Sequence, residues 1–408
     1  MRPRRRVSSS NFLNRGSAKR SFTPGAHFSN PLLIALVSPF PPLKGGIARF
    51  SSRLQTAFEE TGIEVIAVPF RRLYPRWLLS GRTAMESGAG QCPASPFFLD
   101  LMNPLTWFRT ASLIRQLKPD VIVVAYWTGL LAPLCAVMRR LSGRKTVVLL
   151  HNFTSHEKLP GEKLLKRLLV ASSDGFITLS ESVSRELAAF SAGSSTATLF
   201  HPLYEPQGVV PSKQDARRRM GLAQTSKVLL FFGYVREYKG LDTLFEAMAI
   251  VLKQDPSVRL VVSGEFILDV ARFRELARRL GIAGSVDIQP GYVPAERVST
   301  LFASADAVVL PYRSASQSGI VPLAVGHGVP VIACDAGALG AQIRHGRTGW
   351  IVEHQGPSAL AEGILEFFNE RDMISFQQGF EESRTAMSWK AFTGEAAAFL
   401  EICTGGAA

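Results

Sequence analysis

Two short segments contain residues that could bind a negatively charged ligand. Gly45 and Gly46 precede a helical pattern that begins at Ile47. Glycines let the backbone approach a ligand, and the free N–H groups and positive dipole end of a helix attract anions. Arg236 and Lys239 lie three residues apart beside another helix start, where a fork of donors and a point charge would suit a diphosphate. The simpler alternatives, a tight turn for the glycines and a solvated loop for the cations, stay open.

A third candidate anion site lies in the loop 314–319, which joins an apolar run to another helical pattern. The loop consists of small or polar residues. Ser318, Gly319 and Ile320 are expected to present backbone N–H groups at the helix start. Such a cluster of N–H groups is typical of sites that hold phosphate oxygens.

Side chains that could bind a hydroxyl group follow two of the apolar runs. His151 and Asn152 end one run, with His156 and Glu157 in the loop behind them, and Glu265 ends another. A histidine at the edge of a cleft can orient a sugar or polarise an acceptor hydroxyl. Two alternatives remain: His151 as a core residue bonded to backbone, and His156 with Glu157 as a loop pair that merely position each other.

Short apolar runs alternate with helix-length amphipathic segments from residue 30 onward, and this rhythm occurs twice. The first series of predicted strands is Leu32–Ser38, Ile63–Val68, Val121–Ala125, Thr146–His151, Phe176–Leu179 and Thr196–Phe200. The second is Val228–Phe232, Arg259–Ser263, Ser285–Ile288, Ala307–Leu310, Val329–Ala333 and Trp350–Val352. Continuous Val, Ile and Leu strands separated by helices are typical of parallel sheets covered on both faces. The predicted fold class is α/β, with two Rossmann-like domains whose sheets face a central cleft.

The domain boundaries follow from the same rhythm. They are a disordered basic tail at 1–30, an N-terminal domain at 31–203, a C-terminal domain at 204–385 and a terminal helix at 386–408 that packs back on the N-terminal domain. The uncharged run 121–138 is long enough to suggest a membrane span. Its β-branched start and its internal Gly129 and Pro133 favour a buried strand, a loop and a helix. No GxGxxG motif follows a strand, which weighs against a nicotinamide-dependent dehydrogenase.

Five motifs in register resemble the family 4 (group 1) glycosyltransferases of the GT-B fold. They are Pro42–Phe50, Phe232–Leu241, Val286–Val293 together with Leu301–Asp306, Pro311–Ala333 and His345–Val352. The resemblance covers roughly residues 32–400. It implies a glycosyltransferase that moves a sugar from a nucleotide-sugar donor, held mainly by the C-terminal domain, to an acceptor on the side of the N-terminal domain. It also implies retention of the anomeric configuration.

The sequence departs from this family at two positions that usually hold glutamates. Aligning the family's loop glycine with Gly319 places Ser316 and Ala324 there, and the second glutamate usually holds the donor ribose. The arginine that usually follows the strand glycine is Tyr234 here, and Arg236 can replace it. A GT-B epimerase would need carboxylates at the empty positions. We interpret the changes as divergence, with a catalytically inactive sugar- or nucleotide-binding partner protein as the alternative.

Residue chemistry and the resemblance together assign roles. The catalytic candidates are His151, Arg236 and Lys239. The donor-binding candidates are Gly45, Gly46, Glu265, Gly291, Tyr292, Ser318, Gly319 and Ile320, with Glu265 as a replacement ribose partner. The acceptor-binding candidates are Asn152, His156 and Glu157. No metal and no cofactor is expected, because no DxD-like carboxylate pair ends a strand and fixed cations would stabilise the leaving diphosphate.

Composition and charge narrow the possible partners. The 408 residues are 46% hydrophobic and carry a net charge of +13, and the four cysteines lie far apart with no CxxC pair. These values argue against a disordered chain, a disulfide scaffold and a zinc ribbon, and the cysteines fit a reducing compartment. Residues 1–30 contain seven Lys or Arg and no acid, so we expect a solvated arm, a segment that touches anionic lipid, or a targeting segment.

Two basic segments of the N-terminal domain predict contact with an anionic membrane surface. Residues 71–82 mix arginines with aromatic and apolar residues, and Lys163, Lys166 and Arg167 are expected to share a helix face with leucines. A polyprenyl-linked sugar acceptor at the cytoplasmic face of the cell membrane follows as a hypothesis, with an ordinary surface helix as the alternative. No nucleic acid partner is expected, because no RNA or DNA motif accompanies the charge.

Overall fold

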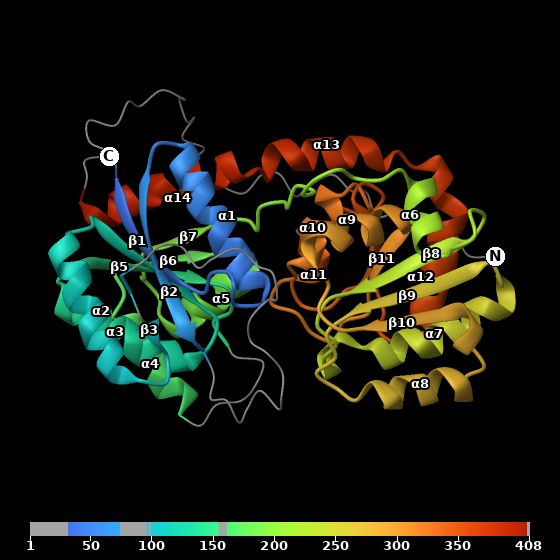
Figure 1. Cartoon of the computed structure of the whole chain (residues 1–408), viewed down its shortest axis with the longest axis horizontal. Coiled ribbons are helices and arrows are strands. Elements are labelled where there is room, and N and C mark those ends of the chain that lie inside the picture. The colour runs from blue at the N-terminus through green and yellow to red at the C-terminus, as the bar shows by residue number, and fades with distance from the viewer. Residues whose placement is uncertain (1–31, 74–95, 98, 155–160, 406–408) are drawn as a thin grey trace, which may run out of the picture.

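The computed structural model describes residues 32–73, 96–97, 99–154 and 161–405. Figure 1 shows two α/β domains side by side, the first in blue and green and the second in yellow and orange. The predicted tail 1–30 and most of the basic segment 71–82 lie outside the described residues. The α/β class and the two parallel sheets that the sequence predicts are confirmed.

The N-terminal domain is built on a parallel sheet in the order β3-β2-β1-β4-β5-β6-β7. Its strands are β1 (Leu33–Ser38), β2 (Glu64–Arg72), β3 (Leu99–Asp100), β4 (Val121–Tyr126), β5 (Lys145–Leu150), β6 (Gly175–Thr178) and β7 (Thr196–Thr198). Its helices are α1 (Gly46–Glu60), α2 (Pro104–Leu117), α3 (Ala132–Ser142), α4 (Glu162–Ala171) and α5 (Glu181–Phe190), with a short 3-10 turn η2 (Gly129–Leu131) before α3. The run 121–138 is therefore strand β4, a turn and most of helix α3, as its sequence predicts.

The C-terminal domain repeats this topology with the sheet order β10-β9-β8-β11-β12-β13. Its strands are β8 (Lys227–Phe232), β9 (Val258–Gly264), β10 (Val286–Pro290), β11 (Ala307–Leu310), β12 (Val331–Cys334) and β13 (Gly349–Val352). Its helices are α6 (Lys213–Arg219), α7 (Leu241–Gln254), α8 (Val270–Arg279), α9 (Ala295–Ser304), α10 (Ile320–Gly326), α11 (Leu339–Gln342), α12 (Pro357–Glu370) and α13 (Phe376–Ala386). The 3-10 turns η3 (Glu237–Lys239), η4 (Ala283–Ser285) and η5 (Arg371–Met373) complete it.

Each sheet buries both faces, which explains the continuous apolar runs in its strands. In the N-terminal domain, α2 to α5 cover one face, while α1 and the last helix α14 (Trp389–Thr404) cover the other. In the C-terminal domain, α7, α8 and α12 cover one face and α9 and α10 the other. Neighbouring residues of a strand point to opposite faces, so a strand between two helical layers needs apolar residues at every position.

Two chain crossings join the domains. The segment after β7 crosses once, and the junction between α13 and α14 crosses back beside it, with the N–H of Leu203 donating to the carbonyl of Met387 at 2.9 Å. Figure 1 shows α13 leading from the C-terminal domain toward α14 on the N-terminal domain. Trp389, Phe392 and Leu400 of α14 lie in the same core as α1.

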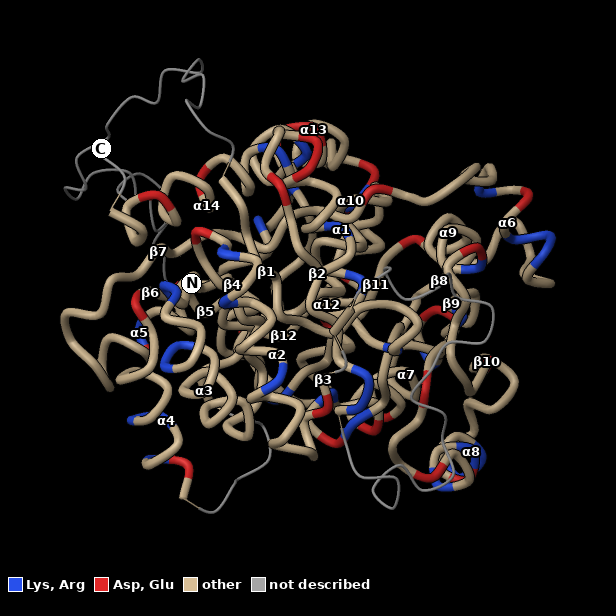
Figure 2. The backbone as a smooth tube through the Cα atoms, turned by 60° about the vertical axis from the view of Figure 1, so that its left-hand side comes forward, with Lys and Arg blue, Asp and Glu red and all other residues tan. Residues whose placement is uncertain are grey.

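The surface helices carry mixed charge. Figure 2 shows basic and acidic residues together on α8 and α13. Within the described ranges, no helix combines the length and the apolar character that a membrane span requires.

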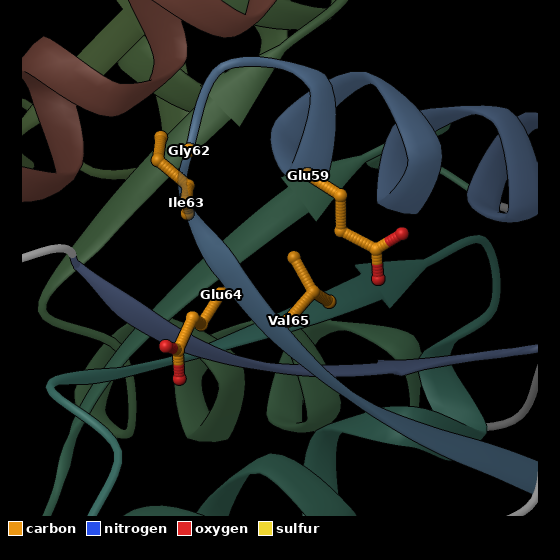
Figure 3. Close-up of a pocket in the computed structure, with 5 residues that line it drawn as sticks. All are labelled: Glu59, Gly62, Ile63, Glu64 and Val65. Carbon is orange, nitrogen blue, oxygen red and sulfur yellow. The ribbon is translucent and has the colours of Figure 1, made fainter.

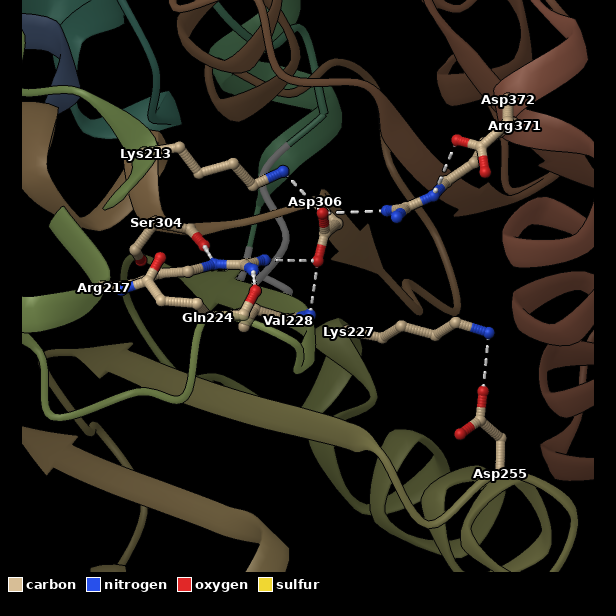
Figure 4. A network of polar contacts seen from close by, with 10 residues as sticks. All are labelled: Lys213, Arg217, Gln224, Lys227, Val228, Asp255, Ser304, Asp306, Arg371 and Asp372. Atoms are coloured by element: carbon tan, nitrogen blue, oxygen red, sulfur yellow. Dashed lines mark hydrogen bonds and ion pairs between the residues drawn. The ribbon is translucent and has the colours of Figure 1, made fainter. Parts of the chain in front are cut away.

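A buried carboxylate stabilises the C-terminal sheet at the amino-terminal ends of its strands. Asp306 precedes β11 and its side chain is almost fully buried (Figure 4). It pairs with Lys213 at 2.5 Å, with Arg217 at 2.8 Å and with Arg371 at 2.8 Å. It also accepts the N–H of Val228, the second residue of β8, at 2.6 Å. Two helical segments, α6 and η5, and two strands therefore converge on one side chain.

The charges around Asp306 outweigh the effect of its burial. Burial alone would raise the pKa of this carboxyl, but the hydrogen bond and charge of Lys213, the Val228 N–H and the charge of Arg371 hold the pKa below its ordinary value. A carboxyl whose pKa is lower in the folded chain stabilises the fold above its unfolded pKa. That contribution is lost as the pH falls through the folded pKa.

Replacing Asp306 should therefore destabilise the chain. We expect Asp306→Asn to lower the free energy of unfolding by roughly 3 kcal/mol at pH 7, because it leaves buried Arg217 without its counter-charge. Urea unfolding followed by circular dichroism measures the change. Asp372→Asn is the matched control, since Asp372 pairs with the same Arg371 but is exposed, and it should cost less than about 1 kcal/mol. Equal losses in the two variants would contradict this account.

Candidate functional site

A cleft of about 1190 Å³ lies between the domains at the carboxyl ends of their strands. Segments that follow β1, β3, β4, β5 and β7 line it from the N-terminal domain, and segments that follow β8, β9, β10 and β11 line it from the other. All strands of a parallel sheet end at one edge, so residues far apart in sequence are brought together there. Every described candidate lines this cleft except Gly291, which precedes Tyr292.

Lys239 is a buried cation with no carboxylate in ion-pair distance among the described residues. It ends η3, its exposed fraction is 7%, and its ammonium lies 5.2 Å from the centre of the Tyr312 ring. Gly240 allows this placement, because a Cβ at that residue would lie 2.1 Å from the carbonyl oxygen of Pro311. Burial lowers the pKa of Lys239, and the nearby charge of Arg236 lowers it further, while Tyr238 acts in the opposite direction. An anion in the cleft would compensate this charge.

Arg236 lines the cleft beside Lys239, whereas the acid between them points elsewhere. Glu237 pairs with Arg272 at 3.4 Å and with Arg313 at 3.6 Å on the outer surface. Its carboxylate therefore forms its ion pairs away from Lys239, which lines the cleft. The sequence motif thus separates into a basic inner side and an acidic outer side.

The loop 314–319 differs from the predicted anion cradle. The N–H of Ser318 donates to Oε1 of Gln342 at 2.9 Å, and the N–H of Ile320 donates to the Ser318 hydroxyl at 3.2 Å. The expectation that three consecutive N–H groups are open is wrong for these two, because the helix start is capped internally. Gly319 keeps an N–H that donates to no acceptor among the described residues.

The same loop docks on the N-terminal domain. The Ser316 hydroxyl donates to Oδ1 of Asn152 at 2.5 Å, and the Ser316 carbonyl accepts from the Ser180 hydroxyl at 3.0 Å. Nε2 of Gln317 donates to the carbonyl of His151 at 2.8 Å. Asn152, an acceptor candidate, is therefore engaged in closing the cleft. His156 and Glu157 lie outside the described residues.

The two positions where the family usually has glutamates serve other purposes here. Ser316 forms the interdomain hydrogen bonds just described. Ala324 belongs to α10 and is fully buried in the core of the C-terminal domain. Glu265 follows β9 and lines the cleft, and its Oε2 is buried without a hydrogen-bond partner among the described residues. An unpaired buried carboxylate oxygen at a strand end is suited to accept hydroxyl groups of a ligand.

Tyr292 and α1 meet across the cleft. Nη2 of Arg49 donates to the Tyr292 hydroxyl at 2.5 Å, and the Lys44 ammonium lies 5.0 Å from the centre of the Tyr292 ring. Gly45 has a φ of 132°, which favours glycine, and Gly45 and Gly46 have open space where a Cβ would project. The glycines therefore leave room at the start of α1, as a ligand there would require.

His151 is a neutral histidine at the centre of the cleft. It directly follows β5, its ring contacts Phe50 edge-on at 5.0 Å, and its buried Nε2 has no partner among the described residues. Burial, with a smaller effect of His201, lowers its pKa to about 3. A neutral imidazole can hold a hydroxyl group by a hydrogen bond, but at neutral pH it does not carry a charge.

Sequence reasoning missed three residues of the cleft. His201 lies beside Phe50, and its Nδ1 donates to the Pro202 carbonyl at 3.0 Å, which leaves Nε2 as an acceptor next to Gly319. Oε1 of Gln317 and Nε1 of Trp389 are buried and unpartnered among the described residues. No local motif marks His201 or Trp389. Only the position of His201 directly after the predicted strand Thr196–Phe200 was a usable signal.

A shallow hollow of about 400 Å³ lies at the end of α1, away from the strand ends that form the cleft (Figure 3). Figure 3 shows Glu59 and Glu64 on opposite sides of the chain there, so their carboxylates do not converge. Across the described part of the chain, no three His, Cys, Asp or Glu side chains are placed to hold a metal ion.

The basic face predicted for α4 is smaller than expected. Lys166 pairs with Glu162 at 3.3 Å, donates to Thr154 and lies over the Phe153 ring at 4.7 Å. Of the three cations that the sequence predicts on one face of α4, Lys163 and Arg167 are exposed, whereas Lys166 is half-buried.

The buried histidines should make the chain sensitive to acid. In the unfolded chain His151 takes up a proton as the pH falls below its ordinary pKa of 6.5. In the folded chain burial lowers this pKa to about 3, so the imidazole stays neutral between pH 7 and pH 5. Stability should fall by about 2 kcal/mol between pH 7 and pH 5 on this account. Urea unfolding should show that His151→Asn removes this part of the loss and that His354→Asn, at an exposed position, does not. The same pH dependence in His151→Asn and the unmodified chain would contradict the assignment.

Comparisons with known proteins agree with this architecture. The family model for glycosyltransferase family 4 matches residues 44–202, and the model for glycosyl transferases group 1 matches residues 212–387. The chain is 29% identical over 381 residues to D-inositol 3-phosphate glycosyltransferase 1 of Catenulispora acidiphila, covering 87% of this chain and 89% of that protein. It is 28% identical over 289 residues to the D-inositol 3-phosphate glycosyltransferase of Streptomyces avermitilis, covering 65% of this chain and only 61% of that relative's length.

The fold is also that of solved glycosyltransferases. The structure of HepE from Anabaena in complex with UDP and glucose superposes with a TM-score of 0.70 at 16% identity, covering 91% of this chain and 100% of that one. The two regions that match family models together span most of the chain. It therefore belongs to the family 4 (group 1) glycosyltransferases and has the GT-B fold.

Proposed function

We propose that this chain transfers a sugar from a nucleotide-sugar donor to a hydroxyl group of a sugar or polyprenyl-linked sugar, with retention of anomeric configuration, in polysaccharide or glycolipid synthesis. The observation that carries this proposal is the buried ammonium of Lys239 at the carboxyl edge of the C-terminal sheet, which pairs with no carboxylate among the described residues. Arg236 lies beside it in the lining of the same cleft. Two cations there would hold the diphosphate of the donor.

The reaction needs little proton transfer by the protein. The bond between C1 of the sugar and the diphosphate oxygen breaks, and its electron pair stays on the diphosphate. The acceptor oxygen then bonds to C1 on the same face, and its proton passes to the departing phosphate oxygen. Lys239, Arg236 and the N–H of Gly319 stabilise the charge that builds on the diphosphate. His151 orients a hydroxyl group in neutral form, in keeping with its low pKa.

The relatives support parts of this proposal. The HepE structure contains UDP and glucose, which favours a nucleotide-sugar donor for this chain. The curated relatives are named for D-inositol 3-phosphate as acceptor. Cations at an acceptor site would be needed to bind such a phosphate. Among the described residues of the N-terminal domain that line the cleft, the cations Arg49 and Arg53 already contact other groups, which favours a different acceptor.

An inactive binding protein is the second candidate. The internal capping of Ser318 and Ile320 and the buried Ala324 favour it, because they reduce the contacts available to a nucleotide. Peripheral contact with an anionic membrane at the cytoplasmic face stays part of the proposal. It rests on exposed Lys163 and Arg167 beside Leu164, which is 69% exposed.

Removing the buried cation should abolish most of the activity. We expect Lys239→Met to lower turnover of the donor by roughly 10²–10³, the effect of losing one charge-stabilising group. Release of nucleoside diphosphate from a panel of nucleotide-sugars measures it. Lys253→Met, at an exposed site on α7 of the same domain, serves as the control and should keep full activity. Unchanged turnover in a folded Lys239→Met chain would remove this residue from the site.

The role of Glu265 can be tested separately. If its free oxygen binds the ribose, Glu265→Gln should weaken binding of a nucleoside diphosphate by roughly tenfold to a hundredfold, because hydrogen bonds to a charged group contribute about 1.5–3 kcal/mol. Pyrophosphate, which lacks the ribose, should bind the variant unchanged. Calorimetry compares the two ligands, with Glu246→Gln as a surface control on α7. Loss of pyrophosphate and nucleotide binding to the same extent would sink the ribose assignment.

A further inference from the structure

The acceptor side of the cleft has an apolar wall beside the reaction centre. Trp127 follows β4 and His151 follows β5, and these neighbouring strands pair so that the N–H of His151 donates to the carbonyl of Tyr126 at 2.9 Å. Adjacent parallel strands lie about 4.8 Å apart. Trp127 is therefore next to the histidine whose Nε2 awaits a partner.

The described residues that form the wall around Trp127 are uncharged. The described cleft residues that follow β3 and β4 are Met102, Trp127, Thr128 and Leu130. Met102 is 41% exposed and Leu130 is 42% exposed, so apolar surface faces the cleft. Phe70 contacts the Trp127 ring edge-on at 6.0 Å, which holds the indole in place.

The cations of the N-terminal domain that line the cleft are committed elsewhere. Arg49 donates to the Tyr292 hydroxyl and to the Val293 carbonyl. Arg53 pairs with Glu60 at 3.1 Å and lies over the Trp389 ring. A phosphorylated acceptor would find no uncommitted cation among the described residues of this wall, whereas an apolar group would replace water on Trp127 and Leu130 favourably.

An exposed apolar strip leads away from this wall. Met102 immediately precedes the N-cap of α2, and Leu105 and Phe108 stand one turn apart on that helix with 76% and 49% of their surface exposed. Met102 belongs to both the cleft and the strip. Exposed Arg109 and Arg115 lie on the same helix, which favours an anionic lipid surface next to the strip.

We propose that Trp127, Leu130 and Met102 form an acceptor subsite for a glycoside whose hydroxyl-bearing sugar is joined to a long apolar chain, and that Leu105 and Phe108 carry this chain out of the cleft. The inference rests on the proposed function, since it specifies the acceptor of the same reaction. The apolar chain lies on the strip, the sugar lies over Trp127, and its hydroxyl reaches His151.

Binding of alkyl glucosides to the full chain tests the subsite without knowledge of the natural sugar. We expect octyl β-glucoside, below its micelle concentration, to bind at least roughly tenfold more tightly than methyl β-glucoside, the effect of burying about two methylene groups. Glucose 6-phosphate should bind no better than the methyl compound. The double variant Leu105→Gln with Phe108→Gln, at exposed positions that folding tolerates, should remove most of the octyl preference. Trp127→Phe should weaken both glucosides.

Leu117→Gln is the matched control, because Leu117 is 45% exposed at the opposite end of the same helix. It should leave the octyl preference intact. Equal binding of octyl and methyl glucoside, no binding of either, or a preference that survives the double variant would overturn the proposal. Titration of a panel of nucleoside diphosphates in the same experiment separates the two claims: binding of a nucleotide without an octyl preference refutes this acceptor subsite alone, whereas no binding of any nucleotide refutes the proposed function.

Discussion

The parallel direction of the strands is the constraint on which the whole molecule depends. Every strand of a parallel sheet ends at one edge, and here the edges of two such sheets meet. Residues from segments as distant as 45–50, 151–152, 236–239 and 318–319 therefore line one cleft. The opposite edge of the C-terminal sheet carries the Asp306 cluster, which serves stability. Chemistry and anchoring are thus placed at opposite ends of the same strands.

Two charged groups of the cleft lack an ionic partner among the described residues, whereas the buried carboxylate at the opposite edge of the C-terminal sheet is fully paired. The buried Asp306 has three cations and a backbone N–H around it, but the buried Lys239 has no described carboxylate within reach. Glu265 likewise keeps a buried oxygen without a partner. Burying a polar group without a partner costs free energy of folding. A ligand that pairs with both Lys239 and Glu265 would therefore bind without a further cost for desolvating these two side chains. The two imbalances have opposite sign and suit different parts of one donor.

The sequence predicted the architecture well because its signals are local. Runs of Val, Ile and Leu marked most of the strands. Strand β3 was missed because a strand of two residues is too short to show a periodic pattern. The motif around Lys239 was found by its cations. The loop 314–319 was only partly foreseen, since the Gln342 side chain that caps Ser318 comes from a distant helix. His201 and Trp389 enter the cleft through chain crossings, which no spacing in the sequence reveals.

The central claim is that the cleft binds the diphosphate of a nucleotide-sugar through its buried positive charge. Calorimetric titration of the intact chain with inorganic pyrophosphate, in competition with a nucleotide-sugar, tests this most directly. The account predicts one nucleotide-sugar molecule per chain, displaced by pyrophosphate, with affinity that falls as salt rises. Binding of a nucleotide-sugar that pyrophosphate does not displace, or no binding of any nucleotide-sugar, would contradict it.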